Sequence, residues 1–301
     1  MIITRVQSFC NNWISLSLQS YQNFCTIFFK SYFADRNTYY DCRVILQNYK
    51  GKQTLMRKIA PTAAALLTAA IVPTVSVCAA DCTRIGYGQG TSVDALNRPT
   101  DALQFNARYG DLDAFALSAD EKRIVITFDQ GYENGYTASI LDTLREKNVH
   151  AIFFLTGDYA KREEALVKRM IAEGHTLGNH GMTHASLPTL SEEAARKEIM
   201  SLHEFVLNNY GYEMQYFRCP CGEYSEQALE TVQECGYKTV FWSFAYVDWK
   251  TDAQPSATEG LDKLTKSAHG GEILLLHSVS ATNAEILGDV IDSFRAQGYT
   301  V

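Results

Sequence analysis

Six residues that can carry acid–base or metal chemistry stand where apolar stretches of this sequence end. They are Asp129, His180, His184, Arg218, Asp248 and His277. A carboxylate after a buried strand is costly unless something there uses it. Singly, each has a structural explanation, since a strand-end aspartate is often a helix N-cap and a lone histidine is more often a packed or surface residue. All six at strand ends, or in the loop just after one, predict a reaction centre.

The elements that must position these residues alternate along the chain. Apolar stretches at 123–128, 150–157, 175–180, 215–220, 238–245, 272–278 and 299–301 predict strands. Amphipathic stretches at 135–148, 162–174, 191–210, 225–236, 256–269 and 281–298 predict helices, and Ser191 is the expected N-cap of the longest. Seven alternations predict an α/β fold with a parallel sheet closed into a distorted (β/α)7 barrel, whose reacting groups lie at the carboxyl ends of the strands. The sequence stops inside the seventh strand, so we expect it to be truncated there.

Five short motifs connect these residues to a known family. They are TFDQG, HGMTH, RCPCG, DW and LLH, in this order, at residues 127–131, 180–184, 218–222, 248–249 and 275–277. The set resembles the polysaccharide deacetylases, also called the NodB homology domain or carbohydrate esterase family 4, over residues 124–301. Two longer stretches, FDQGYENGY and VFWSFAYVDW, resemble the branch of peptidoglycan N-acetylmuramic acid deacetylases that act in spore-cortex synthesis. The resemblance implies a hydrolase that removes N-acetyl groups.

The resemblance implies a role for each of four residues. Amide hydrolysis needs a base for water, stabilisation of an oxyanion and an acid for the leaving nitrogen. Asp129 matches the base, and Arg218 would hold its carboxylate oriented and ionised. His277 matches the acid, and Asp248 would fix its tautomer and favour its protonated form.

Three further residues match the substrate-binding positions of the family. The backbone N–H of Cys221 would donate to the oxyanion, and Trp249 and Leu275 would line a small slot for the acetyl methyl group. Trp249 has an alternative role as a packed core residue. Cys219 and Cys221 depart from the usual family residues, a change that a backbone role tolerates.

The metal position also departs from the common family pattern. His180 and His184 match two ligands of a divalent cation (Zn²⁺, Mn²⁺ or Co²⁺), but the third ligand, usually an aspartate, is Gln130. An amide oxygen can bind a cation but brings no charge, so we expect a weak site. The muramic-acid branch tends to carry an amide here too.

The favoured function is therefore an exported deacetylase acting on N-acetylmuramic acid in peptidoglycan strands, in the formation of spore-cortex muramic δ-lactam. One alternative is a deacetylase of another polymer: N-acetylglucosamine in peptidoglycan, chitin or acetylxylan. The other is a catalytically inert sugar-binding relative. We expect a monomer.

The start of the chain differs in character from the rest. Residues 1–55 show no sustained periodicity, whereas Met56–Ala80 has basic residues, an apolar run and small residues, as in a secretory signal. We therefore expect residues 1–55 to be an over-extended start, and 56–80 to be a cleaved signal or, alternatively, a membrane anchor. A polar extension at 81–119 would precede the catalytic domain at 120–301. This organisation predicts a secreted or membrane-anchored protein outside the cytoplasm.

Composition limits the remaining possibilities. The chain has 301 residues, 46% of them hydrophobic, and a net charge of −7 without a basic block, so nucleic acid is not an expected partner. Four of the eight cysteines follow residue 80, namely Cys82, Cys219, Cys221 and Cys235. None has C-x-x-C spacing, so we predict neither a zinc knuckle nor a disulfide framework.

Overall fold

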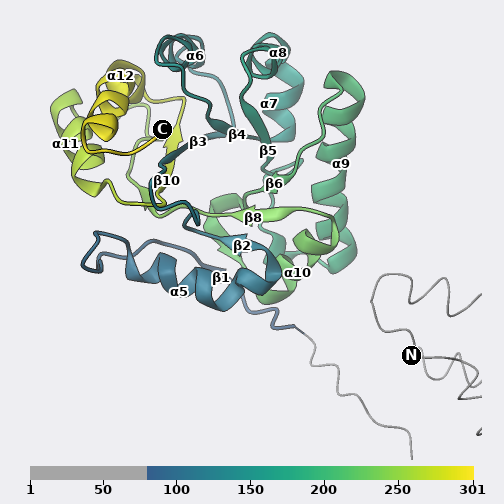
Figure 1. Ribbon diagram of the computed structural model, residues 1–301. Helices are drawn as coiled ribbons and strands as arrows, with labels where there is room; N and C mark the ends of the chain where they lie inside the picture. Colours follow the sequence, from purple (N-terminus) through teal and green to yellow (C-terminus); the bar gives the residue numbers. More distant parts are fainter. Residues whose placement is uncertain (1–79) are drawn as a thin grey trace, which may run out of the picture. The chain divides into compact units, whose positions relative to one another are not determined.

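Residues 80–301 are described by a computed structural model, and their main feature is one curled sheet of eight strands (Figure 1). The strands are β2 (Ala114–Phe115), β3 (Val125–Gln130), β4 (Ile152–Leu155), β5 (Thr176–Asn179), β6 (Tyr216–Phe217), β8 (Lys238–Val240), β9 (Phe244–Ala245) and β10 (Ile273–His277). They lie in the order β2-β8-β6-β5-β4-β3-β10-β9, and the pairings between them are parallel. A separate antiparallel pair joins β1 (Ile85–Gly86) to β7 (Glu223–Tyr224).

Helices surround the outside of this sheet (Figure 1). They are α5 (Thr100–Tyr109), α6 (Thr137–Glu146), α7 (Gly157–Arg162), α8 (Glu164–Ala172), α9 (Glu192–Tyr210), α10 (Glu226–Glu234), α11 (Ala257–Ser267) and α12 (Ala281–Ala296). Short 3-10 turns occur at Gly110–Leu112, Leu187–Thr189 and Pro220–Gly222. The hydroxyl of Ser191 accepts a hydrogen bond from the Ala194 N–H, so it caps α9 as the sequence predicts.

The two faces of the sheet are packed differently because successive side chains of a strand point to opposite sides. In β4, Phe153 belongs to the large hydrophobic cluster shared with the helices. Its neighbour Phe154 belongs to a small cluster with Val240 and Ile273, which come from β8 and β10. Strands from across the sheet thus meet on its inner face, and their apolar side chains fill the barrel.

The predicted parallel α/β barrel is confirmed, with a difference at 238–245. This stretch forms two strands instead of one: β8 pairs with β6 and β2, and β9 pairs with β10. Between them Ser243 bonds to Ile273 through its N–H and its hydroxyl. The stretch therefore runs from one end of the open sheet to the other and closes the barrel. The expected last strand at 299–301 contributes a single bridge, Thr300 to Arg123.

The segment before the barrel is more structured than its polar composition predicts. It contributes β1, strand β2 of the main sheet and the ten-residue helix α5, which the sequence analysis did not predict. The helix buries Ala102, Phe105 and Tyr109, and it lies beside β1 and β2 in Figure 1. A short helix at α7 was also missed. The proposed boundary near residue 119 stays a prediction, but the segment shares the core of the barrel.

Several predictions concern residues outside the described part of the chain. The leader at 1–55 and nearly all of the signal segment at 56–80 are among them. Within residues 80–301, no helix is both long and apolar enough to cross a membrane. The four cysteines of this part are free thiols.

Candidate active site

The register of the parallel strands brings the predicted residues to one end of the barrel. Asp129 and His277 are directly paired residues of the neighbouring strands β3 and β10. On the other side of β3, strands β5 and β6 end at the same level of the sheet. The hydrogen bond from the Arg218 N–H to the Asn179 carbonyl shows this alignment. His180 and Arg218 therefore reach the same carboxyl edge as Asp129 and His277.

Asp129 and Arg218 form a buried ion pair. Arg218 Nη1 lies 2.8 Å from Asp129 Oδ1, and the arginine side chain is 0% exposed. The guanidinium also donates to the Thr127 hydroxyl and to the carbonyls of Val240 and Phe241. Burial raises the pKa of Asp129, but the positive charge of Arg218, with smaller contributions from His180 and His277, outweighs it and leaves the pKa below 3.8. The carboxylate is therefore ionised at neutral pH.

His277 is held by Asp248. The Nδ1–H of His277 donates to Asp248 Oδ1 over 2.7 Å, and the His277 backbone N–H donates to Oδ2 over 2.8 Å. Burial lowers the pKa of His277, but the hydrogen bond and charge of Asp248 and the charge of Asp129 outweigh this effect. The pKa of His277 is therefore above 6.5. This arrangement leaves Nε2 free to carry a proton toward the cavity.

Asn283 is a further member of this group that the sequence analysis missed. Its amide donates to Asp248 Oδ2 over 2.6 Å and to the His277 carbonyl over 3.2 Å. The only signal in the sequence is a polar residue, 1% exposed in the structure, on the buried face of the helix that follows LLH. Helix asparagines are common, so the sequence alone does not distinguish it.

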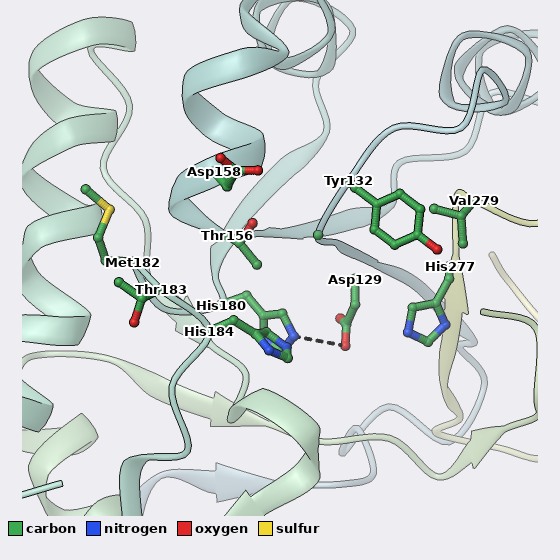
Figure 2. A pocket seen from close by; sticks show the side chains of 11 residues that line it. Asp129, Tyr132, Thr156, Asp158, His180, Met182, Thr183, His184, His277 and Val279 are labelled. Carbon is green, nitrogen blue, oxygen red and sulfur yellow. Dashed lines mark ion pairs between the residues drawn. The ribbon is translucent and has the colours of Figure 1, made fainter. Parts of the chain in front are cut away.

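His180 and His184 lie side by side, with ring centroids 4.7 Å apart. His180 donates its Nδ1–H to the Arg218 carbonyl over 2.8 Å, which leaves Nε2 as a lone pair 3.6 Å from Asp129 Oδ2 (Figure 2). Burial lowers the pKa of His180 to about 4 and lowers that of His184 as well. Both rings are thus neutral at pH 7, the form in which imidazole binds metals.

A buried glutamate holds the loop that carries His184. Glu198 of α9 accepts hydrogen bonds from the Thr183 N–H, the Thr183 hydroxyl and the Ala185 N–H. Gly181 of this loop has φ +82°, and a Cβ there would lie 2.8 Å from Glu198 Oε1. The glycine of HGMTH is required for this approach. Glu198 was not predicted, because an acidic residue in an amphipathic helix is usually on its solvent face.

Two histidines fit a divalent cation, and the third expected ligand, Gln130, is not among the residues that line the cavity. Gln130 is fully buried; its amide nitrogen donates to Ser278, and its Oε1 has no partner. In the described part of the chain, no group of three or more His, Cys, Asp or Glu residues is arranged for a metal. The structure therefore supports His180 and His184 as a two-imidazole site, and the ligand role of Gln130 stays a prediction.

These side chains line a cavity of about 400 Å³ at the carboxyl end of the barrel. Figure 2 shows Asp129 between His180 and His184 on one side and His277 on the other. Eleven residues line it: Asp129, Gly131, Tyr132, Thr156, Asp158, His180, Met182, Thr183, His184, His277 and Val279. This volume is in the range of small-molecule sites.

The three predicted substrate-binding residues are not among those that line this cavity. Trp249 is 46% exposed and its ring centroid is 5.6 Å from that of His277, so it is not a core residue. Leu275 is buried two residues before His277 on β10, on the same face of the strand. Cys221 has φ +59°, an uncommon conformation outside asparagine and glycine that His184 shares at +60°. Such outliers concentrate at functional sites.

Comparison with known proteins agrees with this geometry. The family model "Polysaccharide deacetylase" matches residues 116–240. The peptidoglycan-N-acetylmuramic acid deacetylase PdaA of Bacillus subtilis is 43% identical over 219 residues, covering 72% of this chain and 82% of the relative. A peptidoglycan-N-acetylglucosamine deacetylase of Bacillus cereus is 33% identical over 183 residues, covering 60% of this chain and 85% of the relative. The solved structure of PdaA, a family 4 carbohydrate esterase, superposes with a TM-score of 0.69 at 41% identity, over 73% of this chain and 94% of that one.

The chain belongs to the polysaccharide deacetylase family, carbohydrate esterase family 4, whose members hydrolyse N-acetyl amide bonds. Within that family it is similar to the muramic acid deacetylase PdaA. The family is generally metal-dependent, which agrees with the paired neutral imidazoles of His180 and His184.

Proposed function

We propose that this protein removes the N-acetyl group of N-acetylmuramic acid in peptidoglycan strands, as an exported enzyme of spore-cortex muramic δ-lactam formation. The observation that carries the reaction is the preformed pairing of Asp129 with Arg218 and of His277 with Asp248, on adjacent strands at the edge of one cavity. The sugar is supported by the similarity to PdaA and by the stretches FDQGYENGY and VFWSFAYVDW.

In the first half of the reaction, a water molecule attacks the acetyl carbonyl carbon and Asp129 takes its proton. Arg218 keeps the carboxylate oriented throughout, through a contact of 2.8 Å. The carbonyl oxygen becomes an oxyanion, for which the backbone N–H of Cys221 is the proposed donor. The lowered pKa of Asp129 keeps it ionised but also makes it a weak base.

In the second half, the bond between the carbonyl carbon and nitrogen breaks, and His277 Nε2 gives its proton to the leaving amine. The raised pKa of His277 favours the protonated form that this step needs. After acetate leaves, Asp129 loses the proton it took from water and His277 regains one, which returns both residues to their starting states. A divalent cation held by His180 and His184 would polarise the acetyl carbonyl and acidify the attacking water. That help matters here because the base itself is weak.

The inert sugar-binding alternative explains the site less well. Asp129, Arg218 and Asp248 have side chains no more than 10% exposed, and burying such charges costs free energy. A protein that only binds sugar has no need of two oriented acid–base pairs. Gln130 is the residue that favours the inert alternative, but the muramic-acid branch also tends to carry an amide at this position.

Acetate release from defined glycans tests the proposal. The protein is incubated, with and without added Zn²⁺, Mn²⁺ or Co²⁺, with peptide-free peptidoglycan strands, chitooligosaccharides and acetylxylan. We expect release from the peptidoglycan strands to exceed release from the other two polymers. Equal or greater release from chitooligosaccharides or acetylxylan would contradict the proposed substrate. No release from any of the three polymers would favour the inert alternative.

Export is proposed from the sequence of 56–80, since peptidoglycan lies outside the cytoplasm. N-terminal sequencing of the protein from secreting cells should give a start at Ala80 or Asp81. A start at or before Met56 in the membrane fraction would favour the anchored form.

A further inference from the structure

The loop that follows Asp129 is tied down on two sides. The Glu133 carboxylate accepts hydrogen bonds from the Gly135 N–H, the Thr137 N–H, the Thr137 hydroxyl and the Tyr159 hydroxyl. The Asn134 amide donates to the Val279 carbonyl over 2.9 Å, which links this loop to the one after β10. Five hydrogen bonds thus hold residues 133–137, so the preceding Tyr132 is presented from a fixed backbone.

The side chain of Tyr132 is largely exposed. Its side chain is 54% exposed, yet it lines the cavity. Figure 2 shows its ring beside Val279 and near His277, on the side of the cavity away from His180 and His184. Its hydroxyl has no hydrogen-bond partner among residues 80–301, although a phenol both donates and accepts. An amphipathic ring fixed at a cavity wall with an unused hydroxyl is suited to contact with a ligand.

The charges around the cavity limit how it can recognise an acidic substrate. Neither lysine nor arginine is among the eleven lining residues, while Asp129 and Asp158 are. Arg218 is buried and committed to Asp129. His277 is committed through Nδ1 to Asp248 and through Nε2 to the leaving nitrogen. A carboxylate on the substrate therefore finds no free side-chain cation within the cavity.

The other hydroxyl groups in the lining already have hydrogen-bond partners. The Thr183 hydroxyl donates to Glu198 over 3.0 Å. The Thr156 hydroxyl is the N-cap of α7 and accepts from the Tyr159 N–H. Tyr132 is thus the one lining residue whose hydroxyl has no partner in the described part of the chain. Its hydroxyl is a neutral donor. A cationic donor in this cavity would also be attracted to the Asp129 carboxylate, whereas a neutral hydroxyl is not.

We propose that the Tyr132 hydroxyl recognises the lactyl carboxylate at O3 of muramic acid, which makes Tyr132 a specificity-determining residue of this site. The inference rests on the proposed function. Muramic acid differs from glucosamine by this lactyl ether, and the carboxylate is free once the stem peptide has been removed. A hydrogen bond to a charged acceptor is roughly twice as strong as one between neutral groups. Because only muramic acid offers this carboxylate, such a bond favours it over glucosamine. Glu133 and Asn134 act as positioning residues for Tyr132.

The test uses Tyr132→Phe, which keeps the ring and removes the donor. Kinetic constants are measured on peptide-free strands and on the same strands with lactyl carboxylates converted to methylamides. Leu207→Ala is the control, since Leu207 is another exposed apolar side chain, 42% exposed and absent from the cavity lining. We expect Tyr132→Phe to lose about tenfold or more in kcat/KM on the acid strands, mainly through KM, and less than about twofold on the amide strands. The control should match wild type on both.

The outcomes separate the two proposals. Equal losses on both kinds of strand, or retention of more than about half of the wild-type kcat/KM on the acid strands, would overturn the role of Tyr132 and leave the proposed function intact. If the wild-type protein releases no acetate from muramic acid in either kind of strand, the proposed function fails and this inference fails with it.

Discussion

At the scale of single residues, the site consists of titratable groups whose protonation is set by a few contacts. Arg218 keeps Asp129 ionised, Asp248 raises the pKa of His277, and burial keeps His180 and His184 neutral. Each role can be removed by one substitution with little change in side-chain volume. The effects differ, because these groups also compensate each other's charge.

Asp129→Asn should lower acetate release by on the order of 10²-fold or more, because it removes the proposed base. From the sequence alone the fold is expected to tolerate this change, since the residue is not a packing group. The structure corrects that expectation, because Asp129 is the counter-ion of the fully buried Arg218. We expect a loss of roughly 3 kcal/mol in the free energy of unfolding.

Chemical denaturation and acetate release at a temperature where the variant is folded measure these two effects separately. Asp262→Asn is the control, because its ion pair with Lys266 is exposed and should contribute less than about 1 kcal/mol. Turnover by folded Asp129→Asn above about a tenth of wild type would remove Asp129 from the role of base.

Asp248→Asn should move the alkaline limb of the activity profile to lower pH. His277 must be protonated to donate, and Asp248 holds its pKa above 6.5. Without that negative charge, burial lowers the pKa of His277, so its proton is lost at lower pH. We expect a shift of about one pH unit or more in the alkaline limb of kcat/KM. An unchanged limb would mean that His277 is not the acid.

Gln130→Asp tests the metal position. A carboxylate at this position is the usual third ligand in the family, so if residue 130 faces the metal, calorimetric titration should give tighter binding of Zn²⁺ or Mn²⁺ than in wild type. The bond from the Gln130 amide to Ser278 is lost in this variant. Equal affinities of the two proteins would mean that residue 130 does not face the metal.

At the scale of elements, the strands and their carboxyl ends were predictable, whereas the loops and the closure of the barrel were not. Asp129, His180, Arg218 and His277 each follow a short apolar run, and the parallel register places them at one edge. Phe241–Ser243 interrupts an apolar stretch that looks like one strand, because closure of the barrel depends on partners distant in sequence. Tyr132, Glu198 and Asn283 were missed since their roles depend on contacts between elements.

Helix α5 illustrates the same limit. Its buried residues have helical spacing, but this spacing does not reveal which partners they meet. Phe105 packs among Tyr87, Tyr109, Tyr224 and Phe241. The cluster joins the segment before the barrel to β7 and to the stretch that closes it.

Phe105→Ala should therefore destabilise the whole barrel by about 3–5 kcal/mol, with kcat of the folded protein unchanged. Urea denaturation measures the loss, and Leu207→Ala, exposed on α9, should stay within about 0.5 kcal/mol of wild type. A loss below about 1 kcal/mol for Phe105→Ala would mean that residues 80–119 are an appendage and that 120–301 is a self-sufficient domain.

At the scale of the whole molecule, the proposal assigns the reaction to the barrel and the choice of sugar to the loops around its cavity. Family members similar to this chain are named for different sugars, muramic acid for PdaA and glucosamine for the Bacillus cereus relative. Membership of the family therefore does not by itself identify the substrate. The distinguishing chemistry is the lactyl group at O3, whose carboxylate is exposed only after the stem peptide is removed.

Mass spectrometry of digested peptidoglycan tests the central claim most directly. Intact strands and strands treated with an amidase are incubated with the protein, digested to muropeptides and analysed for the loss of an acetyl group from each sugar. We predict loss from muramic acid only after the amidase treatment. Loss of acetyl groups from glucosamine residues in untreated strands would contradict the account.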